Sequence, residues 1–430
     1  MLKHGLVAAV AVLLLSSAHT WAQTQTQTQN KLIPHLEMDM TGQEYSQILN
    51  LIATPDDFNG AHDNGLKLVL KMGKRNLDWL KFINDNRDEH HKISLSSAAT
   101  QIGNPIETPR LYNPSIILKN YQDLIAQVPD SIKTVILGTG SLPVNPPVTD
   151  EEFCTWGRKL DHEYQMAARW TLMENYLSGM AQRKTQDVRG YYFLAKDPNV
   201  QAELQGWSKL DLQTQKTLTE YLVEMCYNST YSDNCLVLVG EAITQNKVFE
   251  LYQRYLPASK NLWDSFFSIQ QNRNDVQWKH NPEEMHVPFR DPNNAKVKSY
   301  LSDNIQDEWK WNDWHLLLDF RTDTQDMPEV QFEPGSTPHV NGLAGNIITM
   351  DDNAPLTEYD VQWTIRHEFG HVLGFPDCYV EFYDEPNTVM ISYQLDITNL
   401  MCSRRGHLKQ THFDEVKRAY GGSLSINKGL

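Results

Sequence analysis

Apolar residues recur at helical spacing through the first two thirds of the chain. In segments 44–53 (EYSQILNLIA) and 65–85 (GLKLVLKMGKRNLDWLKFIND) they stand three or four residues apart, which predicts amphipathic helices. The stretch 138–150 (GTGSLPVNPPVTD) is rich in Gly and Pro and ends in a helix-start signal, so it predicts a connection. Residues 151–270 return to helical spacing, and they predict a long helix-rich region.

The pattern changes near residue 273. Short apolar or alternating runs bounded by Gly, Pro and acidic residues replace the helical spacing, and such runs predict strands. The last predicted helix has Thr357 as its N-cap, with Asp360 three residues further on in a capping arrangement. Strands and one helix, followed by a second helix, predict an α+β fold class. The predicted strands span 284–290, 314–322, 329–335 and 344–352, and the predicted helices span 293–311 and 356–374.

Composition and the N-terminus bear on the cellular location. The chain has 430 residues, 40% of them hydrophobic, which is enough for two or three domains, and its net charge of −16 argues against nucleic-acid binding. Residues 1–22 combine Lys3, an apolar run and a small-residue end at Ala22, the arrangement of a secretory signal peptide. No later run is long and apolar enough to predict a membrane span. We therefore expect a secreted or periplasmic protein.

Five cysteines suit an oxidising compartment. Cys226 and Cys235 flank a turn-like segment and form one expected disulfide, and Cys378 and Cys402 flank a second loop and form the other. Cys154 is left over. It is either a buried free thiol or a thiolate that caps zinc in a latent precursor, and only the odd cysteine count supports the second alternative.

The candidate chemistry lies in residues 364–378 (TIRHEFGHVLGFPDC). His367 and His371 are four residues apart, so a helix aims both imidazoles at one point, and Glu368 can reach a water held by a metal there. Gly374 accepts the positive φ that ends a helix, which brings the carboxylate of Asp377 within reach as a third ligand. Three protein ligands and a water make a catalytic zinc site.

The segment HEFGHVLGFPD (367–377) resembles the extended zinc motif of the metzincin metallopeptidases, and the Asp variant resembles their snapalysin-type branch. The resemblance implies a methionine in a tight turn beneath the metal. Met401 in ITNLMCS suits that role, and Met390 in NTVMISY is the competitor. The resemblance also implies an edge strand that binds the substrate backbone, which is 344–351 here. His407 in RRGHL remains a rival for the third ligand.

Two further features near the motif are left open. Tyr383 and Tyr393 are candidates to assist the oxyanion, although tyrosines at such positions are more often packing residues. The acidic segment 379–387 (YVEFYDEPN) shapes the cleft, holds calcium, or carries carboxylates that are simply solvated.

The expected architecture is a helical N-terminal region followed by a C-terminal metzincin-like metallopeptidase domain with a mixed, twisted sheet and an active-site helix. The expected function is that of a secreted zinc metalloendopeptidase acting on a protein or peptide substrate, with Glu368 as general base. The alternatives are an exported zinc amidase or aminopeptidase acting on short or cell-wall peptides, or a non-catalytic zinc-binding or adhesion protein. The sequence does not give the oligomeric state. The expected units are a signal peptide (1–22), a mostly helical region (23–145), a helical domain (146–272) and the zinc domain (273–430). The part from residue 23 to residue 272 is a propeptide, a retained helical domain that recruits substrate, or both.

Overall fold

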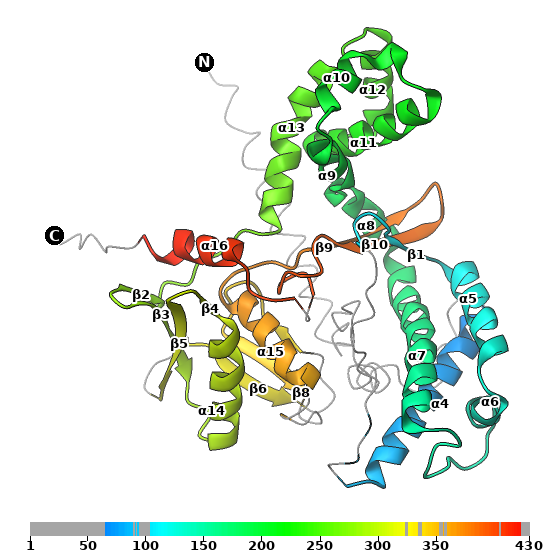
Figure 1. Cartoon of the computed structure of the whole chain (residues 1–430), viewed down its shortest axis with the longest axis vertical. Coiled ribbons are helices and arrows are strands. Elements are labelled where there is room, and N and C mark those ends of the chain that lie inside the picture. The colour runs from blue at the N-terminus through cyan, green and yellow to red at the C-terminus, as the bar shows by residue number, and fades with distance from the viewer. Residues whose placement is uncertain are drawn as a thin grey trace, which may run out of the picture.

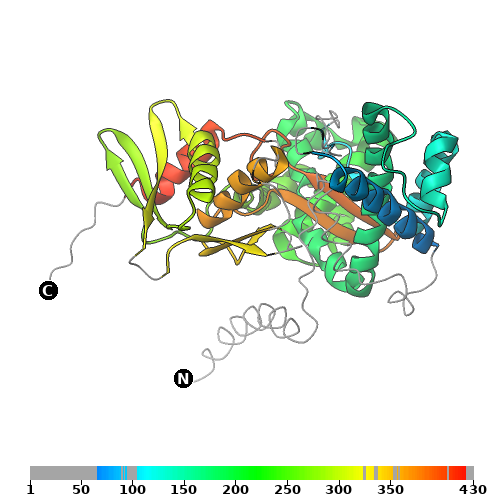
Figure 2. The same cartoon turned by 90° about the horizontal axis from the view of Figure 1, so that it is seen from below.

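The computed structural model describes residues 65–88, 91, 93, 104–322, 326–333, 338–351, 356, 359–403 and 406–422. The expected signal peptide at 1–22, the expected helix at 44–53 and the expected N-cap Thr357 lie outside the described residues. Helices dominate the part before residue 273, and strands and helices share the part after it, consistent with an α+β class (Figures 1 and 2).

The first helical group has a core of its own. Helices α4 (Leu66–Asp85), α5 (Pro114–Gln127), α6 (Asp130–Leu137) and α7 (Asp150–Met173) pack their apolar faces together. The helix start expected at the end of the Gly- and Pro-rich connection is confirmed, because Thr149 Oγ1 accepts a hydrogen bond from the Glu152 amide at 3.2 Å.

A second helical group forms a lobe at one end of the molecule, drawn in green at the top of Figure 1. Its core is built by α9 (Arg189–Lys196), α11 (Leu212–Thr230), α12 (Cys235–Thr244) and α13 (Val248–Ser265). Short elements complete the helical part: η1 (Glu174–Tyr176), α8 (Leu177–Gln182), η2 (Arg183–Gln186), α10 (Val200–Gln205) and η3 (Trp207–Lys209).

The strands between residues 273 and 351 form two adjoining sheets that carry both parallel and antiparallel pairs. One sheet has the order β2-β3-β5-β4 with β3 parallel to β5, and the other has the order β6-β8-β7 with β6 parallel to β8. The Arg290 amide at the end of β3 donates to the carbonyl of Pro328, just before β6, at 2.8 Å, which joins the two sheets. The strands are β2 (Gln277–His280), β3 (Glu283–Arg290), β4 (Lys310–Trp311), β5 (Trp314–Arg321), β6 (Glu329–Glu333), β7 (His339–Val340) and β8 (Ile347–Asp351).

One expectation about this region is wrong, and another is met over a shorter range. The strand within 344–351 is β8, and it is the middle strand of its sheet, so the antiparallel edge strand is β7. The helix expected over 293–311 is present but shorter: α14 (Ala295–Leu301) continues through the π-helical turn η4 (Ser302–Gln306) to residue 308, and the chain then enters β4 at Lys310. The hairpin turn between β4 and β5 forms because Asn312 adopts a positive φ of 52°, and Trp311 pairs with Trp314 across this hairpin turn.

A third sheet connects the first helical group to the C-terminal part. Its order is β1-β10-β9, all antiparallel, and it joins β1 (Arg110–Tyr112) to a hairpin of β9 (Tyr379–Asp384) and β10 (Val389–Gln394). Figure 1 shows the hairpin beside the upper end of α7. The last helix is α16 (Gln410–Tyr420). The expected boundaries at residues 145 and 272 stay predictions.

A buried ion pair holds this connection. Glu381 on β9 accepts from Arg169 Nε and Nη2 on α7 at 2.5 and 2.6 Å, and from the hydroxyl of Tyr112 on β1 at 2.5 Å. Burial alone would raise the pKa of Glu381, but the Arg169 guanidinium and the Tyr112 hydroxyl outweigh it and hold that pKa below its ordinary value. A lowered pKa in the folded chain contributes stability above the unfolded-state pKa, and this stability is lost as the pH falls through the folded value.

Replacing Arg169 should therefore be costly. Arg169→Met leaves the Glu381 carboxylate buried without its cation, and we expect a loss of about 3–5 kcal/mol in the free energy of unfolding at neutral pH. The loss should shrink at acidic pH, where Glu381 in the variant takes up a proton. Denaturant titration at neutral and at acidic pH measures the loss in the free energy of unfolding under each condition. Lys74→Met breaks the exposed pair with Asp78 on α4 and should cost less than about 1 kcal/mol. Equal losses in the two variants would contradict the assigned role of Arg169.

The same connection bears on whether the N-terminal part of the chain is removed by processing. Removal of everything before residue 273 would strip β1 from β10 and Arg169 from Glu381, exposing a sheet edge and a buried carboxylate. We expect N-terminal sequencing of the mature, folded form to give a start before Arg110. A stable mature chain that begins near residue 273 would contradict this prediction.

Candidate metal centre

Helix α15 (Tyr359–Val372) carries the two histidines. Ile365, Phe369 and Val372 are fully buried and fix the helix against the core. His367 and His371 lie one turn apart on another face, with ring centroids 4.9 Å apart, as their spacing predicts.

The helix ends where the sequence predicts. Gly374 has a φ of +91°, and a Cβ at this position would lie 2.0 Å from the carbonyl oxygen of Gln271. Its own carbonyl accepts from the Gln270 amide at 3.0 Å. Both the backbone angle and the close approach thus require glycine, and the chain leaves α15 here and returns towards the two imidazoles.

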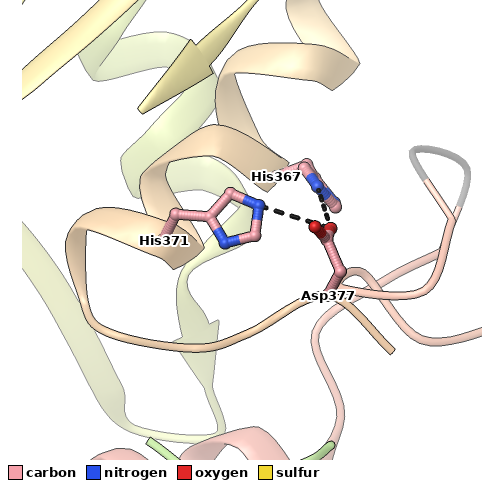
Figure 3. A group of neighbouring side chains, drawn as sticks. All are labelled: His367, His371 and Asp377. Carbon is pink, nitrogen blue, oxygen red and sulfur yellow. Dashed lines mark ion pairs between the residues drawn. The ribbon is translucent and has the colours of Figure 1, made fainter. Parts of the chain in front are cut away.

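Asp377 completes a three-membered cluster. Its Oδ1 lies 3.3 Å from His367 Nε2 and 3.4 Å from His371 Nε2, and the three side chains point toward one another in Figure 3. Within the described residues, this is the one group of three metal-donor side chains that converges, and it contains no fourth donor. In a tetrahedral zinc site with bonds of about 2.0–2.1 Å, neighbouring donors lie about 3.3–3.4 Å apart. The donor types and the spacing from Asp377 to each histidine therefore fit zinc.

Backbone carbonyls orient both rings. His367 Nδ1 lies 2.8 Å from the carbonyl oxygen of Leu400, and His371 Nδ1 lies 2.8 Å from that of Phe375. A carbonyl only accepts, so each Nδ1 carries a proton, and in the neutral rings Nε2 offers its lone pair to the cluster. His367 and His371 are 1% and 9% exposed. Glu368 is buried in the same helical turn at 4% exposure.

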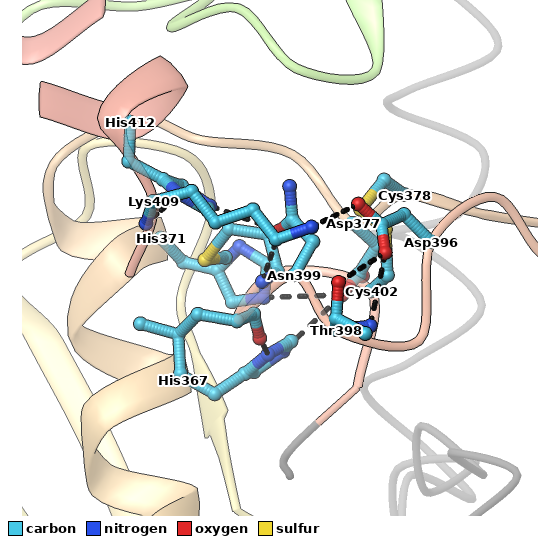
Figure 4. The surroundings of a disulfide bond; sticks show 12 residues. His367, His371, Asp377, Cys378, Asp396, Thr398, Asn399, Cys402, Lys409 and His412 are labelled. Atoms are coloured by element: carbon cyan, nitrogen blue, oxygen red, sulfur yellow. Dashed lines mark hydrogen bonds and ion pairs between the residues drawn. A yellow bond between two sulfur atoms is a disulfide. The ribbon is translucent and has the colours of Figure 1, made fainter. Parts of the chain in front are cut away.

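Met401 packs against helix α15, which carries two of the candidate metal ligands. Its Sδ would lie 2.2 Å from a Cβ at Gly370, the residue just before His371, so helix and methionine are in close contact. The Met401 amide donates to Asn399 Oδ1 at 2.8 Å, and the same oxygen receives His412 Nε2 at 2.9 Å (Figure 4). Burial lowers the pKa of His412 to about 4, so this ring is neutral and its Nε2–H donates.

The rival residues lie elsewhere. His407 is exposed, stacks edge-on against Trp363 and approaches Glu308 at 3.4 Å, so it is not part of the cluster. Met390 belongs to the core of the first helical group. The hydroxyl of Tyr393 donates to Asp187 Oδ1 at 2.8 Å and accepts from the Val188 amide. Tyr383 packs against Trp170 on α7.

Sequence reasoning missed Tyr379. Its hydroxyl donates to Asp377 Oδ2 at 3.3 Å, which helps to turn Oδ1 toward the histidines. The sequence offered a weak signal, since an aromatic residue two positions after a candidate ligand has the reach to touch it. Sequence reasoning also did not anticipate that the acidic segment forms a strand whose carboxylates are paired: Glu381 with Arg169, and Asp384 with Lys184 at 3.0 Å. These two carboxylates are structural rather than solvated.

The cysteines follow the expected pairing. The two disulfides are Cys226–Cys235 and Cys378–Cys402. Cys154 is a free, buried thiol on α7, and it packs in the core of the first helical group rather than in the metal cluster. The disulfides are consistent with a secreted or extracellular protein. Among the described residues, no helix combines the length and apolar content that a membrane crossing requires.

Metal binding at this centre should depend on pH. Burial alone would lower the pKa of His371, but the Asp377 carboxylate outweighs burial and raises it. In the metal-free chain the resulting ion pair is stabilising below the unfolded-state pKa of histidine, and that contribution is lost as the pH rises through the folded value. Zinc needs the neutral ring, so we expect its affinity to rise from about pH 5.5 to about pH 8, with proton release.

Calorimetric titration in buffers of different ionisation enthalpy measures both the zinc affinity and the number of protons released per zinc. Asp377→Asn removes the charge that raises the pKa of His371, so it should release fewer protons per zinc at the acidic end of the range. Zinc affinity and proton release that do not change across this range would contradict the assignment of the two histidines as ligands.

Comparison with known proteins adds no relative: no protein-family model, no curated protein and no solved structure matches the chain.

Proposed function

We propose that the protein is a secreted zinc-dependent metalloendopeptidase. The observation that carries the proposal is the convergence of His367 Nε2, His371 Nε2 and Asp377 Oδ1, with the 3.3 and 3.4 Å contacts that a tetrahedral zinc site requires. Three protein donors leave one coordination position for water or substrate, whereas a purely structural zinc site has four protein donors.

The surroundings of the cluster support the metzincin-like hypothesis. Met401 lies in a turn beneath the metal helix and touches it at Gly370. The upstream strands form a mixed arrangement in which β7, antiparallel to β8, is the edge. The amide of Ala344, in the loop between those two strands, donates to the carbonyl of His371 at 2.8 Å, which keeps this edge beside the cluster.

The chemistry of each side chain assigns its role in the proposed reaction. His367, His371 and Asp377 would hold the ion. Zinc bound there supplies a Lewis acid that lowers the pKa of a bound water and polarises a carbonyl. Glu368 takes a proton from the attacking water and delivers it to the nitrogen of the departing amine. The hydrogen bonds from Nδ1 to Leu400 and Phe375 keep both imidazoles oriented while charge changes at the centre.

Substitution of the proposed base tests the chemistry. Glu368→Gln keeps the size of the side chain but removes proton transfer, so we expect zinc binding to persist while kcat/KM on a casein substrate falls by about 100-fold to 10,000-fold. Glu385→Gln changes an exposed carboxylate in the β9–β10 turn and serves as the matched control with unchanged activity. Full activity of the Glu368→Gln variant would refute the assigned base.

Loss of a ligand tests the metal. His371→Ala should weaken zinc binding by more than the about 10–100-fold that loss of a hydrogen-bonding partner of a ligand costs. Metal analysis after dialysis provides the measurement, and undiminished zinc content would refute the ligand set. The substrate then separates the alternatives. Cleavage of dipeptides but not of casein would favour an exported amidase or aminopeptidase, and zinc binding without hydrolysis would favour a non-catalytic zinc protein.

A further inference from the structure

The disulfide Cys378–Cys402 joins two segments that both serve the metal cluster. Cys378 directly follows the ligand Asp377, and Cys402 directly follows Met401 in the turn beneath the metal helix. Both half-cystines are buried, at 0% and 3% exposure. Figure 4 shows the bond beside Asp377 and the two histidines. The bond therefore lies within the support of the metal centre.

The third ligand has no helix or strand of its own. Residues 375–378 run between the end of α15 and the start of β9 without regular secondary structure. The segment is held at its first residue, where Phe375 is 1% exposed and its amide donates to the Gly370 carbonyl at 3.0 Å. At its last residue, the Cys378 amide donates to the Met401 carbonyl at 3.1 Å, and the disulfide adds a covalent bond to the same turn. Asp377 sits between these two anchors.

The turn at the other end of the disulfide is itself rigid. Asn399 Oδ1 accepts from the Met401 amide and from His412 Nε2, which fixes the turn to α16. The carbonyl of Leu400 in this turn accepts from His367 Nδ1. The segment that orients the first ligand thus also anchors, through Cys402, the segment that carries the third ligand.

From this arrangement we infer that Cys378–Cys402 is a positioning element of the metal centre: it sets zinc affinity by holding Asp377 against the two imidazoles. This inference rests on the proposed function, because zinc is the ion that the centre would bind. A ligand must be held within about 0.5 Å of its productive position for full affinity. Without the covalent link, only non-covalent contacts would hold the C-terminal end of the 375–378 segment: the Cys378 amide donates to the Met401 carbonyl, the Cys378 carbonyl accepts from the Leu395 amide, and the Tyr379 hydroxyl donates to Asp377 Oδ2. Asp377 would then spend part of its time away from the cluster.

The test compares zinc affinity in two variants, each of which lacks one of the two disulfides. Cys378→Ala/Cys402→Ala should bind zinc about 10–100-fold more weakly than the parent chain, as measured by competition with a chromophoric chelator. Alanine is used instead of chemical reduction because free thiols here would themselves bind zinc. The matched control is Cys226→Ala/Cys235→Ala, which removes the disulfide between α11 and α12 and should leave zinc affinity unchanged within about twofold.

A combined variant separates positioning of Asp377 from general loosening. Asp377→Asn should weaken zinc binding in the parent chain, but it should add little in the Cys378→Ala/Cys402→Ala background, where the carboxylate is already displaced. Undiminished zinc affinity after loss of the Cys378–Cys402 bond would overturn the inference, as would a full additional loss from Asp377→Asn. A parent chain that binds no zinc would refute the proposed function instead.

A second measurement covers the case in which the alanine variant does not fold. Hydrogen exchange of the metal-free, oxidised parent chain should show the Cys378 amide protected to a similar degree as the Met401 amide, because the disulfide and their shared contacts hold both. If the Cys378 amide exchanges freely without zinc and becomes protected only when zinc is added, the metal orders the segment. The disulfide then has no positioning role.

Discussion

The candidate metal centre depends on one backbone constraint, the end of helix α15 at Gly374. The two histidines supply only two donors from adjacent turns, and the third must come from chain that has left the helix. Gly374 permits this because its φ is +91° and its hydrogen atom leaves room for the Gln271 carbonyl, which a Cβ would approach to 2.0 Å. A hydrogen bond from the Gln270 amide to the Gly374 carbonyl also ties the helix end to the segment after α13. The ligand geometry is therefore set by how residues 270–271 pack as well as by the motif.

The helical part of the chain is coupled to the centre through the strand that follows Asp377. Glu381, four residues after that ligand, is held by Arg169 on α7 and Tyr112 on β1, and Tyr393 on the neighbouring strand binds Asp187. Each is a buried polar contact, which is costly to leave half-made. These contacts thus fix the β9–β10 hairpin to the helical part of the chain. Next to Asp377, the Cys378–Cys402 disulfide fixes the start of the hairpin to the turn that carries Met401.

Local features of the candidate site could be predicted from the sequence. The four-residue spacing of His367 and His371, the helix end at Gly374 and the reach of Asp377 are short-range consequences of helix geometry and glycine chemistry. The disulfide pairs also followed from the loop segments that the cysteines flank. Long-range pairings could not be predicted. The sequence of 379–387 contains no local signal that Glu381 pairs with Arg169, 212 residues away, or that β1 pairs with β10. The edge-strand assignment failed for the same reason, since the edge position of β7 depends on which strand pairs with β8.

X-ray absorption at the zinc edge of the zinc-loaded, full-length chain tests the central claim most directly. The account predicts one zinc per chain with two imidazole nitrogens and two oxygens, one from Asp377 and one from water, at about 2.0–2.2 Å. Asp377→Asn should alter the oxygen shell and leave the two imidazoles in place. A sulfur shell, a third imidazole or a chain that retains no zinc would contradict the account.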